Sequence, residues 1–233
     1  MQNNSADIAE QKSSRRSLIG ASLKMGMATL SSRILGLVRE QVMAYTFGAS
    51  GWTDAFNVAF RVPNMLRDLF AEGSFSSAFV PIFTEVKLED PEKAKRLLWS
   101  MVVLLGGITT IISFGILVFA PQLVQFFTDA RFTSDPERFQ LTTTLIRIMS
   151  PFLVFVSLAA LFMGVLNTLK IFFVPALAPA FFNLVMIASI LTMPAILKAR
   201  GIHPVLALGI GVLVGGFVQM LVQLPLIFKT AYG

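Results

Sequence analysis

TDAFNVAFRVPNMLRDLFAEGSF, residues 53–75, is the stretch from which the fold of this chain can be worked out. Its polar residues recur at steps of three and four: Asp54, Asn57, Arg61, Asn64, Asp68 and Glu72. On a helix that turns by roughly 100° per residue, they fall within a sector of about 80°. This stripe is roughly 27 Å long, close to the thickness of a bilayer core. It therefore either faces water on a soluble helix or lines a wet path through a membrane.

The composition decides between these two alternatives. Of the 233 residues, 55% are hydrophobic and 14% are charged, and the mean hydropathy is +0.74. Soluble domains carry roughly 25% charged residues, so the sequence predicts a membrane protein. The chain has no cysteine and one histidine, His203, which excludes disulfides and leaves no metal-binding cluster. We expect no metal and no cofactor.

The distribution of apolar residues predicts an all-α, polytopic membrane protein. A polar cytoplasmic tail, residues 1–17, is expected to precede a six-helix transmembrane bundle, residues 18–233. The clearest spanning segment is residues 97–120, which contains no charged residue. No segment alternates with the period of two that a membrane β-barrel needs. The six predicted helices are residues 18–46, 52–83, 97–120, 139–167, 172–197 and 204–228.

The placement of lysine and arginine predicts the orientation of the bundle. With a cytoplasmic N-terminus, the inner segments hold nine of these cations and the outer loops hold four. Because cytoplasmic loops carry the excess of positive charge, both ends of this chain are expected in the cytoplasm. The basic residues lie in short loops or within apolar segments. They do not form the solvated basic face of a nucleic-acid-binding protein, so we expect no nucleic-acid partner.

Charged residues within the first two predicted helices require an explanation. An arginine near the bilayer centre costs at least about 2.5–3.5 kcal/mol on insertion scales. One explanation is ion pairing inside the membrane, with Glu40, Asp54, Asp68 and Glu72 as the counter-ions. The other is a water-filled cavity that binds a bulky anion such as phosphate or diphosphate, which arginine grips with two parallel hydrogen bonds. The arginines in question are Arg33, Arg39, Arg61 and Arg67.

An antiparallel arrangement of these two helices would sharpen the second explanation. With a turn near residues 48–52, Arg39 and Arg61 would lie at one depth, and Arg33 and Arg67 at a second, deeper one. The two levels would be roughly 12–15 Å and 21–24 Å from the outer end of the helices. Four guanidinium groups at two depths are more than ion pairing on these helices would require. This register predicts a receptor for a diphosphate-like anion.

The same residues carry a family resemblance. The chain resembles the MurJ (MviN) lipid II flippases over about residues 18–228, most specifically in its first two helices. The first motifs are SRILGLVRE at 32–40, FGA at 47–49, TDAF at 53–56, VPNMLR at 62–67 and FAEGSFSSAFVP at 70–81. Later ones are VLNT at 165–168, VPALAP at 174–179 and GGFVQMLVQLP at 215–225.

The resemblance implies a fold and a set of site residues. Family members belong to the MOP transporter superfamily and have fourteen transmembrane helices, in two six-helix lobes followed by two more helices. This chain resembles the N-terminal lobe alone, with the C-terminal lobe missing. The essential arginines of the family match Arg33, Arg39 and Arg67, and its acidic residue after the first loop matches Asp54. Asp68 departs from the pattern, because relatives can have a second basic residue there.

The resemblance also implies a function. The family moves lipid II, the undecaprenyl-diphosphate-linked peptidoglycan precursor, from the inner to the outer leaflet of the bacterial cytoplasmic membrane. An arginine-lined cleft would hold the head group and open to each side in turn, with lipid II and membrane lipids as partners. Three other functions remain open: a related exporter of another polyprenyl-linked glycan or drug, a membrane scaffold for cell-wall synthesis, and a polyprenyl-lipid enzyme. The sequence disfavours an enzyme, because the acids are spread along the helix and are not paired.

Overall fold

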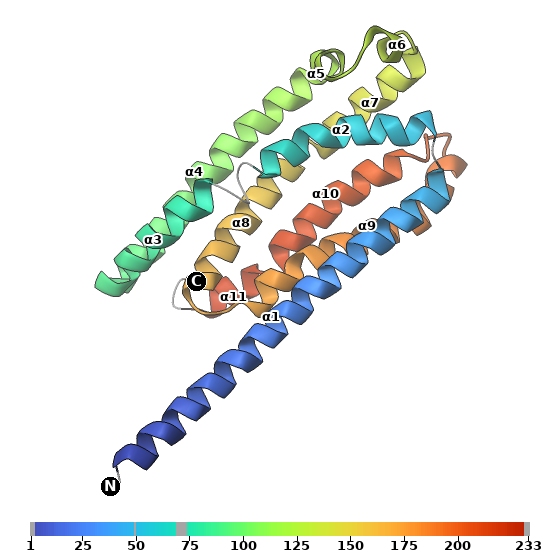
Figure 1. Ribbon diagram of the computed structural model, residues 1–233. Helices are drawn as coiled ribbons and strands as arrows, with labels where there is room; N and C mark the ends of the chain where they lie inside the picture. The colour runs from blue at the N-terminus through green and yellow to red at the C-terminus, as the bar shows by residue number, and fades with distance from the viewer. Residues whose placement is uncertain (1–2, 49, 69–73, 231–233) are drawn as a thin grey trace.

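The computed structural model describes residues 3–48, 50–68 and 74–230, and this part of the chain is helical without a β-strand (Figure 1). The all-α prediction is therefore confirmed. The helices are α1 (Asn3–Phe47), α2 (Gly51–Arg67), α3 (Ser74–Glu89), α4 (Pro91–Val118), α5 (Ala120–Phe127), α6 (Ala130–Thr133), α7 (Pro136–Met149), α8 (Phe152–Thr168), α9 (Phe173–Ala199), α10 (Leu206–Leu221) and α11 (Leu224–Lys229).

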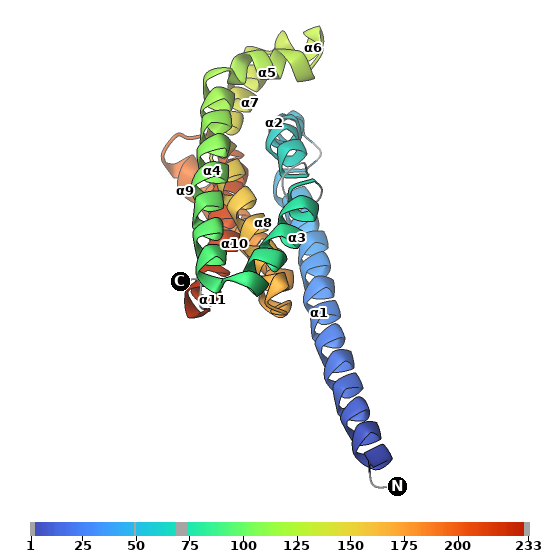
Figure 2. The ribbon, with the colours of Figure 1, turned by 90° about the vertical axis from the view of Figure 1, so that its left-hand side faces the viewer.

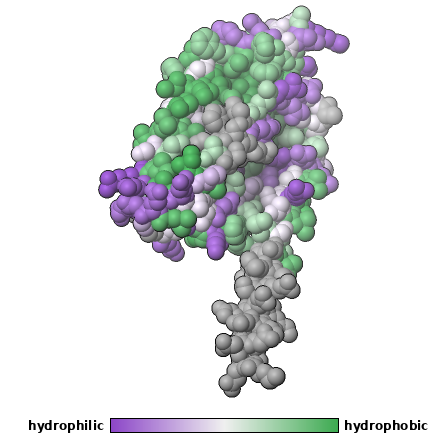
Figure 3. All heavy atoms as spheres, turned by 60° about the vertical axis from the view of Figure 1, so that its left-hand side comes forward, coloured by the Kyte–Doolittle hydropathy of each residue, from purple (hydrophilic) through white to green (hydrophobic). Residues whose placement is uncertain are grey.

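Four helical stretches in the described residues are long and apolar enough to cross a membrane. They are Pro91–Val118, Pro136–Thr168, Phe173–Ala199 and Leu206–Lys229. Figure 3 shows a broad hydrophobic area on this face, with hydrophilic residues at its top, at its lower left and along its right-hand side. Helix α1, with its charged residues, and the 17-residue α2 are not among these four stretches. The membrane fold is confirmed, and six spanning helices remain a prediction.

Several helix boundaries differ from the predicted ones. Helix α1 already begins at Asn3, so residues 3–17, predicted as a tail, are helical and extend away from the bundle (Figures 1 and 2). No proline or glycine precedes Gly20, and alanine, glutamate, glutamine, lysine and arginine all favour a helix. The predicted helix 52–83 is divided between α2 and α3, and residues 69–73 between them lie outside the described residues.

The predicted outer loop after residue 120 contains two short helices, α5 and α6. The Asp129 carboxylate accepts a hydrogen bond from the Phe132 N–H at 2.8 Å and caps α6. The Asp135 carboxylate caps α7 by accepting from the Glu137 and Arg138 N–H groups, each at 3.1 Å. These aspartates satisfy N–H groups that a helix start leaves unpaired. Helices α5 and α6 lie at the end of the bundle opposite the α3–α4 turn (Figures 1 and 2).

The predicted helix 139–167 is interrupted between α7 and α8. Pro151 has no N–H, so the Arg147 carbonyl loses the donor that a continuous helix would supply. The Ser150 hydroxyl donates to that carbonyl at 3.0 Å, and the Ser113 hydroxyl of α4 donates to the Ser150 carbonyl at 2.8 Å. Neighbouring hydroxyls therefore satisfy the backbone at the break, as the absence of water in a bilayer requires.

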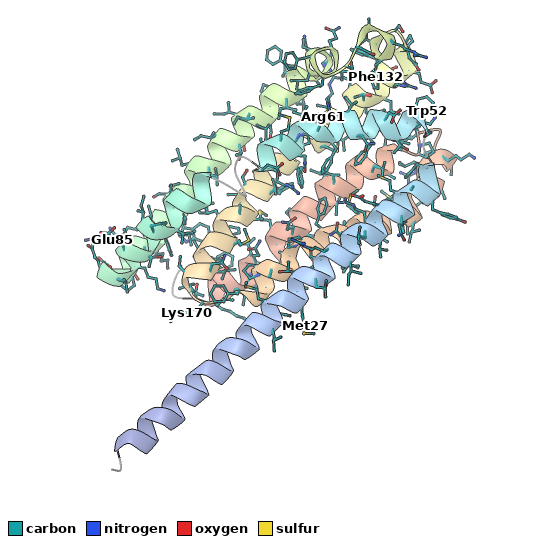
Figure 4. The ribbon with its side chains drawn as sticks, viewed as in Figure 1. Met27, Trp52, Arg61, Glu85, Phe132 and Lys170 are labelled. Atoms are coloured by element: carbon teal, nitrogen blue, oxygen red, sulfur yellow. The ribbon has the colours of Figure 1, made fainter. Side chains whose placement is uncertain are left out.

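Helix α10 is the centre of the bundle, and it packs against α7, α8 and α9. Helix α1 lies along α9, α2 lies along α7, and α4 lies along α8 (Figure 1). Glu85 and Lys170 lie at one end of the bundle and Trp52 and Phe132 at the other (Figure 4). One core cluster joins α2, α4, α5, α7, α8, α9 and α10, and a second joins α3, α4, α8, α10 and α11. Helices α1 and α2 lie along different helices of the bundle.

The N-terminal cap of α4 is open to a direct test. The Asp90 carboxylate accepts from the Glu92 N–H at 2.9 Å and the Lys93 N–H at 3.3 Å, and Pro91 opens the helix. Asp90→Ala is expected to lower the free energy of unfolding by about 1 kcal/mol, because two N–H groups lose their acceptor. Denaturant titration of the purified protein measures this change. Asp90→Ser should restore most of the stability, and Glu89→Ala, an exposed neighbour, is the control; equal losses for both alanine variants would contradict the capping role.

Candidate functional site

A cavity of about 300 Å³ lies inside the bundle, between helices that are far apart in the sequence. Its charged lining residues are Arg39 of α1 and Arg67 of α2. Three amide side chains also line it: Asn183 of α9, Gln219 of α10 and Gln223 at the α10–α11 junction. The other lining residues are small or apolar: Gly36, Phe152, Val156, Ala159, Ala160, Met163, Pro175, Pro179 and Phe182. The volume lies within the range of small-molecule sites.

A second cavity of about 120 Å³ also contacts Arg39. It extends toward the start of α2, where Asn57 of the polar stripe lines it, and Glu40 of α1 contributes a carboxylate. Met43, Phe56, Phe60, Met186 and Val212 complete the lining. Because Arg39 lines both cavities, polar space lies between α1 and α2 at two successive levels. Among the described residues of the polar stripe, Asn57 alone lines either cavity, and the wet path along the whole stripe stays a prediction.

The space exists because α1 and α2 pack against different helices. Helix α1 lies on α9, where the Asn183 side-chain amide donates to the Ser32 carbonyl at 3.1 Å. Gly36 sits one turn further along, and a Cβ there would lie 3.6 Å from the Asn183 amide nitrogen. Helix α2 lies on α7 instead. Arg39 and Arg67 line the same cavity. The antiparallel register, which paired Arg39 with Arg61 and Arg33 with Arg67 by depth, stays a prediction.

Each cavity arginine has an adjacent acidic partner. Arg39 Nη2 lies 2.9 Å from Glu40 Oε1, and Arg67 Nη2 lies 2.8 Å from Asp68 Oδ1. The Glu40 and Asp68 side chains are 64% and 47% exposed. Ion pairs this open contribute only about 0–1 kcal/mol, so an anionic ligand can exchange for the carboxylate. Ion pairing and anion binding are therefore compatible at the same arginines.

The remaining predicted site residues lie elsewhere or outside the described residues. Arg33, Asp54 and Arg61 are exposed, and none of them lines either of the two cavities. Figure 4 shows Arg61 on α2. Glu72 lies outside the described residues. The structure brings together Arg39 and Arg67, with Glu40 and Asp68 beside them.

Sequence reasoning missed the three amides of the cavity. Asn183, Gln219 and Gln223 stand in otherwise apolar segments, where a polar side chain needs a partner. Asn183 is 7% exposed and Gln223 is 1% exposed. Their isolation among apolar residues was the available signal. Whether such a residue holds two helices together or faces a cavity depends on tertiary packing. Here Asn183 and Gln223 each do both.

The hydrogen bond from Asn183 to the Ser32 carbonyl should hold α1 against α9, and this role can be tested. Asn183→Leu is expected to lower the free energy of unfolding by about 1 kcal/mol, the net value of one hydrogen bond. It should also raise the labelling rate of a single cysteine introduced at Gly36, in a chain that has no other cysteine. Thr192→Val is the control, because the Thr192 hydroxyl bonds only within α9, to the Ala188 carbonyl at 2.7 Å. Equal labelling in both variants would exclude a positioning role for Asn183.

The fold and the cavity define a class of protein: polytopic α-helical membrane proteins that enclose a polar, arginine-bearing cavity. A family model described as lipid II flippase MurJ matches residues 43–233. The chain therefore belongs to the MurJ lipid II flippase family, and the resemblance seen in the sequence is confirmed.

Individual relatives agree with this assignment. The lipid II flippase MurJ of Burkholderia cenocepacia is 44% identical over 214 residues, which cover 89% of this chain and 40% of the relative. The probable lipid II flippase MurJ of Treponema pallidum is 36% identical over 226 residues, covering 94% and 41%. A solved structure of lipid II flippase MurJ in an inward closed conformation superposes with a TM-score of 0.71 at 30% identity, covering 90% of this chain and 42% of that one. This chain spans about two fifths of the length of these relatives.

Proposed function

We propose that this chain is the N-terminal lobe of a lipid II flippase of the bacterial cytoplasmic membrane. The observation that carries the proposal is the cavity in which Arg39 and Arg67 meet three amide side chains inside an apolar bundle. The substrate is an undecaprenyl-diphosphate-linked glycopeptide, and its diphosphate is the group that two guanidinium forks recognise best. Family membership and this chemistry support the same substrate class.

The cavity accounts for how a lipid with a large polar head could cross the membrane. The head group would lie in the polar space between α1 and α2, while the polyprenyl tail stays among the lipids. A C-terminal lobe of the full-length protein would supply the opposite wall of the cavity. Alternating access of the two lobes would then expose the cavity first to the inner leaflet and then to the outer one. The protein moves its substrate and leaves it chemically unchanged.

The distribution of charge supports an orientation for this lobe. The inner segments hold the excess of lysine and arginine, so both termini of this chain lie on the cytoplasmic side. The α3–α4 turn and the α8–α9 connection, with Lys170, are then cytoplasmic, and α5 and α6 face outward. The first cavity reaches Pro175, near the start of α9, and the second reaches Asn57, nearer the start of α2. Together they would lie along the path of the head group.

A transport assay on the full-length protein tests this function against the alternatives. The protein is reconstituted in vesicles with fluorescent lipid II, and the outward movement of the probe is followed with a membrane-impermeant quencher. We expect faster quenching of lipid II than in protein-free vesicles, and little acceleration for a polyprenyl-linked glycan of another type or a drug. Equal acceleration of all probes would indicate a broad exporter. No acceleration would favour a scaffold, and a chemically altered lipid would identify an enzyme.

A further inference from the structure

Gln223 has an unusual environment at the junction of α10 and α11. Its side chain is 1% exposed and lines the larger cavity. Its Nε2 donates to the Ala159 carbonyl of α8 at 3.2 Å and to the Gln219 carbonyl at 3.3 Å. Its Oε1 is buried without a hydrogen-bond partner among the described residues. A buried acceptor without a donor is rare, because it bears the full cost of leaving water.

The neighbours of Gln223 determine which way its amide points. Two carbonyl oxygens surround Nε2, and both can only accept a hydrogen bond. Turning the amide over would place Oε1 against these two acceptors, with which an oxygen can form no hydrogen bond. Nitrogen therefore faces Ala159 and Gln219, and Oε1, itself buried, is the atom left without a hydrogen-bond partner among the described residues. A molecule that brings an O–H or N–H donor to this atom would complete the site.

We propose that Gln223, together with Gln219, forms a subsite for the sugar next to the diphosphate, with a hydroxyl or acetamido N–H of an N-acetylated hexosamine as the donor. This inference rests on the proposed function. The two arginines of the cavity are donors only, so they match phosphate oxygens and cannot accept from a sugar. The glutamine amides supply the acceptors that the arginines lack, and Gln219 precedes Gln223 by one helical turn and lines the same cavity. A ligand with an anionic group beside O–H and N–H donors would bind both the arginine donors and the glutamine acceptors.

If the arginines bind the diphosphate and the glutamines bind the sugar, mutations should change the binding of two matched lipid probes differently. The probes are undecaprenyl diphosphate and undecaprenyl-diphosphate N-acetylglucosamine, which differ only in the sugar. Binding to the full-length protein in nanodiscs is measured for each. Gln223→Met is expected to weaken binding of the sugar-bearing probe about fivefold to tenfold, the effect of one lost hydrogen bond. Binding of the bare diphosphate should change less than about twofold, because the arginines remain.

Further variants keep the test decisive if Gln223→Met fails to fold after losing its bond to α8. Gln219→Leu leaves both hydrogen bonds of the Gln223 amide in place, because their acceptors are the backbone carbonyls of Ala159 and Gln219. It should show the same selective loss for the sugar-bearing probe. Gln140→Met, an exposed change on α7 outside the cavity, is the matched control and should bind both probes normally.

The outcomes separate this inference from the function on which it rests. Equal weakening of both probes by Gln219→Leu, or normal binding of both, would overturn the sugar subsite. Selective loss with Gln219→Leu would support it, and selective loss with Gln223→Met would add the second residue. Arg39→Ala should weaken both probes. If it weakens neither, the diphosphate site and the proposed function fail, whatever the glutamine variants show.

Discussion

Arg39→Ala in the full-length protein is expected to weaken binding of undecaprenyl diphosphate by at least about tenfold. Hydrogen bonds to charged groups contribute about 1.5–3 kcal/mol, and each ~1.4 kcal/mol is a factor of ten. Arg39 lines both cavities between α1 and α2, and its guanidinium engages only the exposed Glu40 carboxylate in a described ion pair. Arg67→Ala should have a similar effect, because Arg67 also lines the larger cavity. Binding in nanodiscs measures both, and lipid II transport in vesicles should fall in parallel.

Charge-preserving variants show whether the arginines act through geometry or through charge alone. Arg39→Lys retains the positive charge and loses the planar fork that binds two oxygens, so its binding should lie between wild type and Arg39→Ala. Arg200→Ala, an exposed change at the C-terminus of α9, removes a cation outside the cavity and is the control. Full binding by Arg39→Lys would show that bidentate recognition is the wrong idea. Full binding by both Arg39→Ala and Arg67→Ala would show that neither arginine belongs to the binding site.

Gly216→Ala is expected to destabilise the protein by about 1–3 kcal/mol, the usual cost of overpacking a core. A Cβ at Gly216 would collide with the ring of Phe152, the α8 residue against which α10 packs. Phe152 is 1% exposed, and its ring centroid lies 6.3 Å from that of Phe60 and 5.8 Å from that of Phe182. These neighbours leave the ring little room to move. Gly216→Leu should prevent stable folding altogether.

Glycines on α4 provide the matched control for this prediction. A Cβ at Gly107 or Gly115 would have no atom within 4 Å. Alanine at these positions should preserve stability or raise it by up to about 1 kcal/mol, since alanine favours a helix over glycine. The midpoint of thermal denaturation in detergent, followed by size-exclusion chromatography, compares the three variants. Similar midpoints for all three would show that close approach at Gly216 is unimportant.

Composition and local pattern predicted the class of fold and part of the site. The low charge content predicted a membrane protein, and the motifs around Arg39 and Arg67 predicted the family. Some boundaries could also have been predicted, because Asp90-Pro91 and Asp135-Pro136 are a cap residue followed by a proline that opens a helix. These features depend on neighbours within a turn or two of helix, so they can be read along the chain.

By itself, the sequence determined that this protein is an all-α membrane bundle of the MurJ family with arginines among apolar helices. Only the tertiary structure decided that α1 packs on α9, and that Arg39, Arg67 and Gln223 line one cavity. The reason is physical. In lipid, apolar helices gain little from burial against one another, so close contacts such as Gly216 against Phe152 select their neighbours. Such contacts join residues far apart in the chain, and no local periodicity records them.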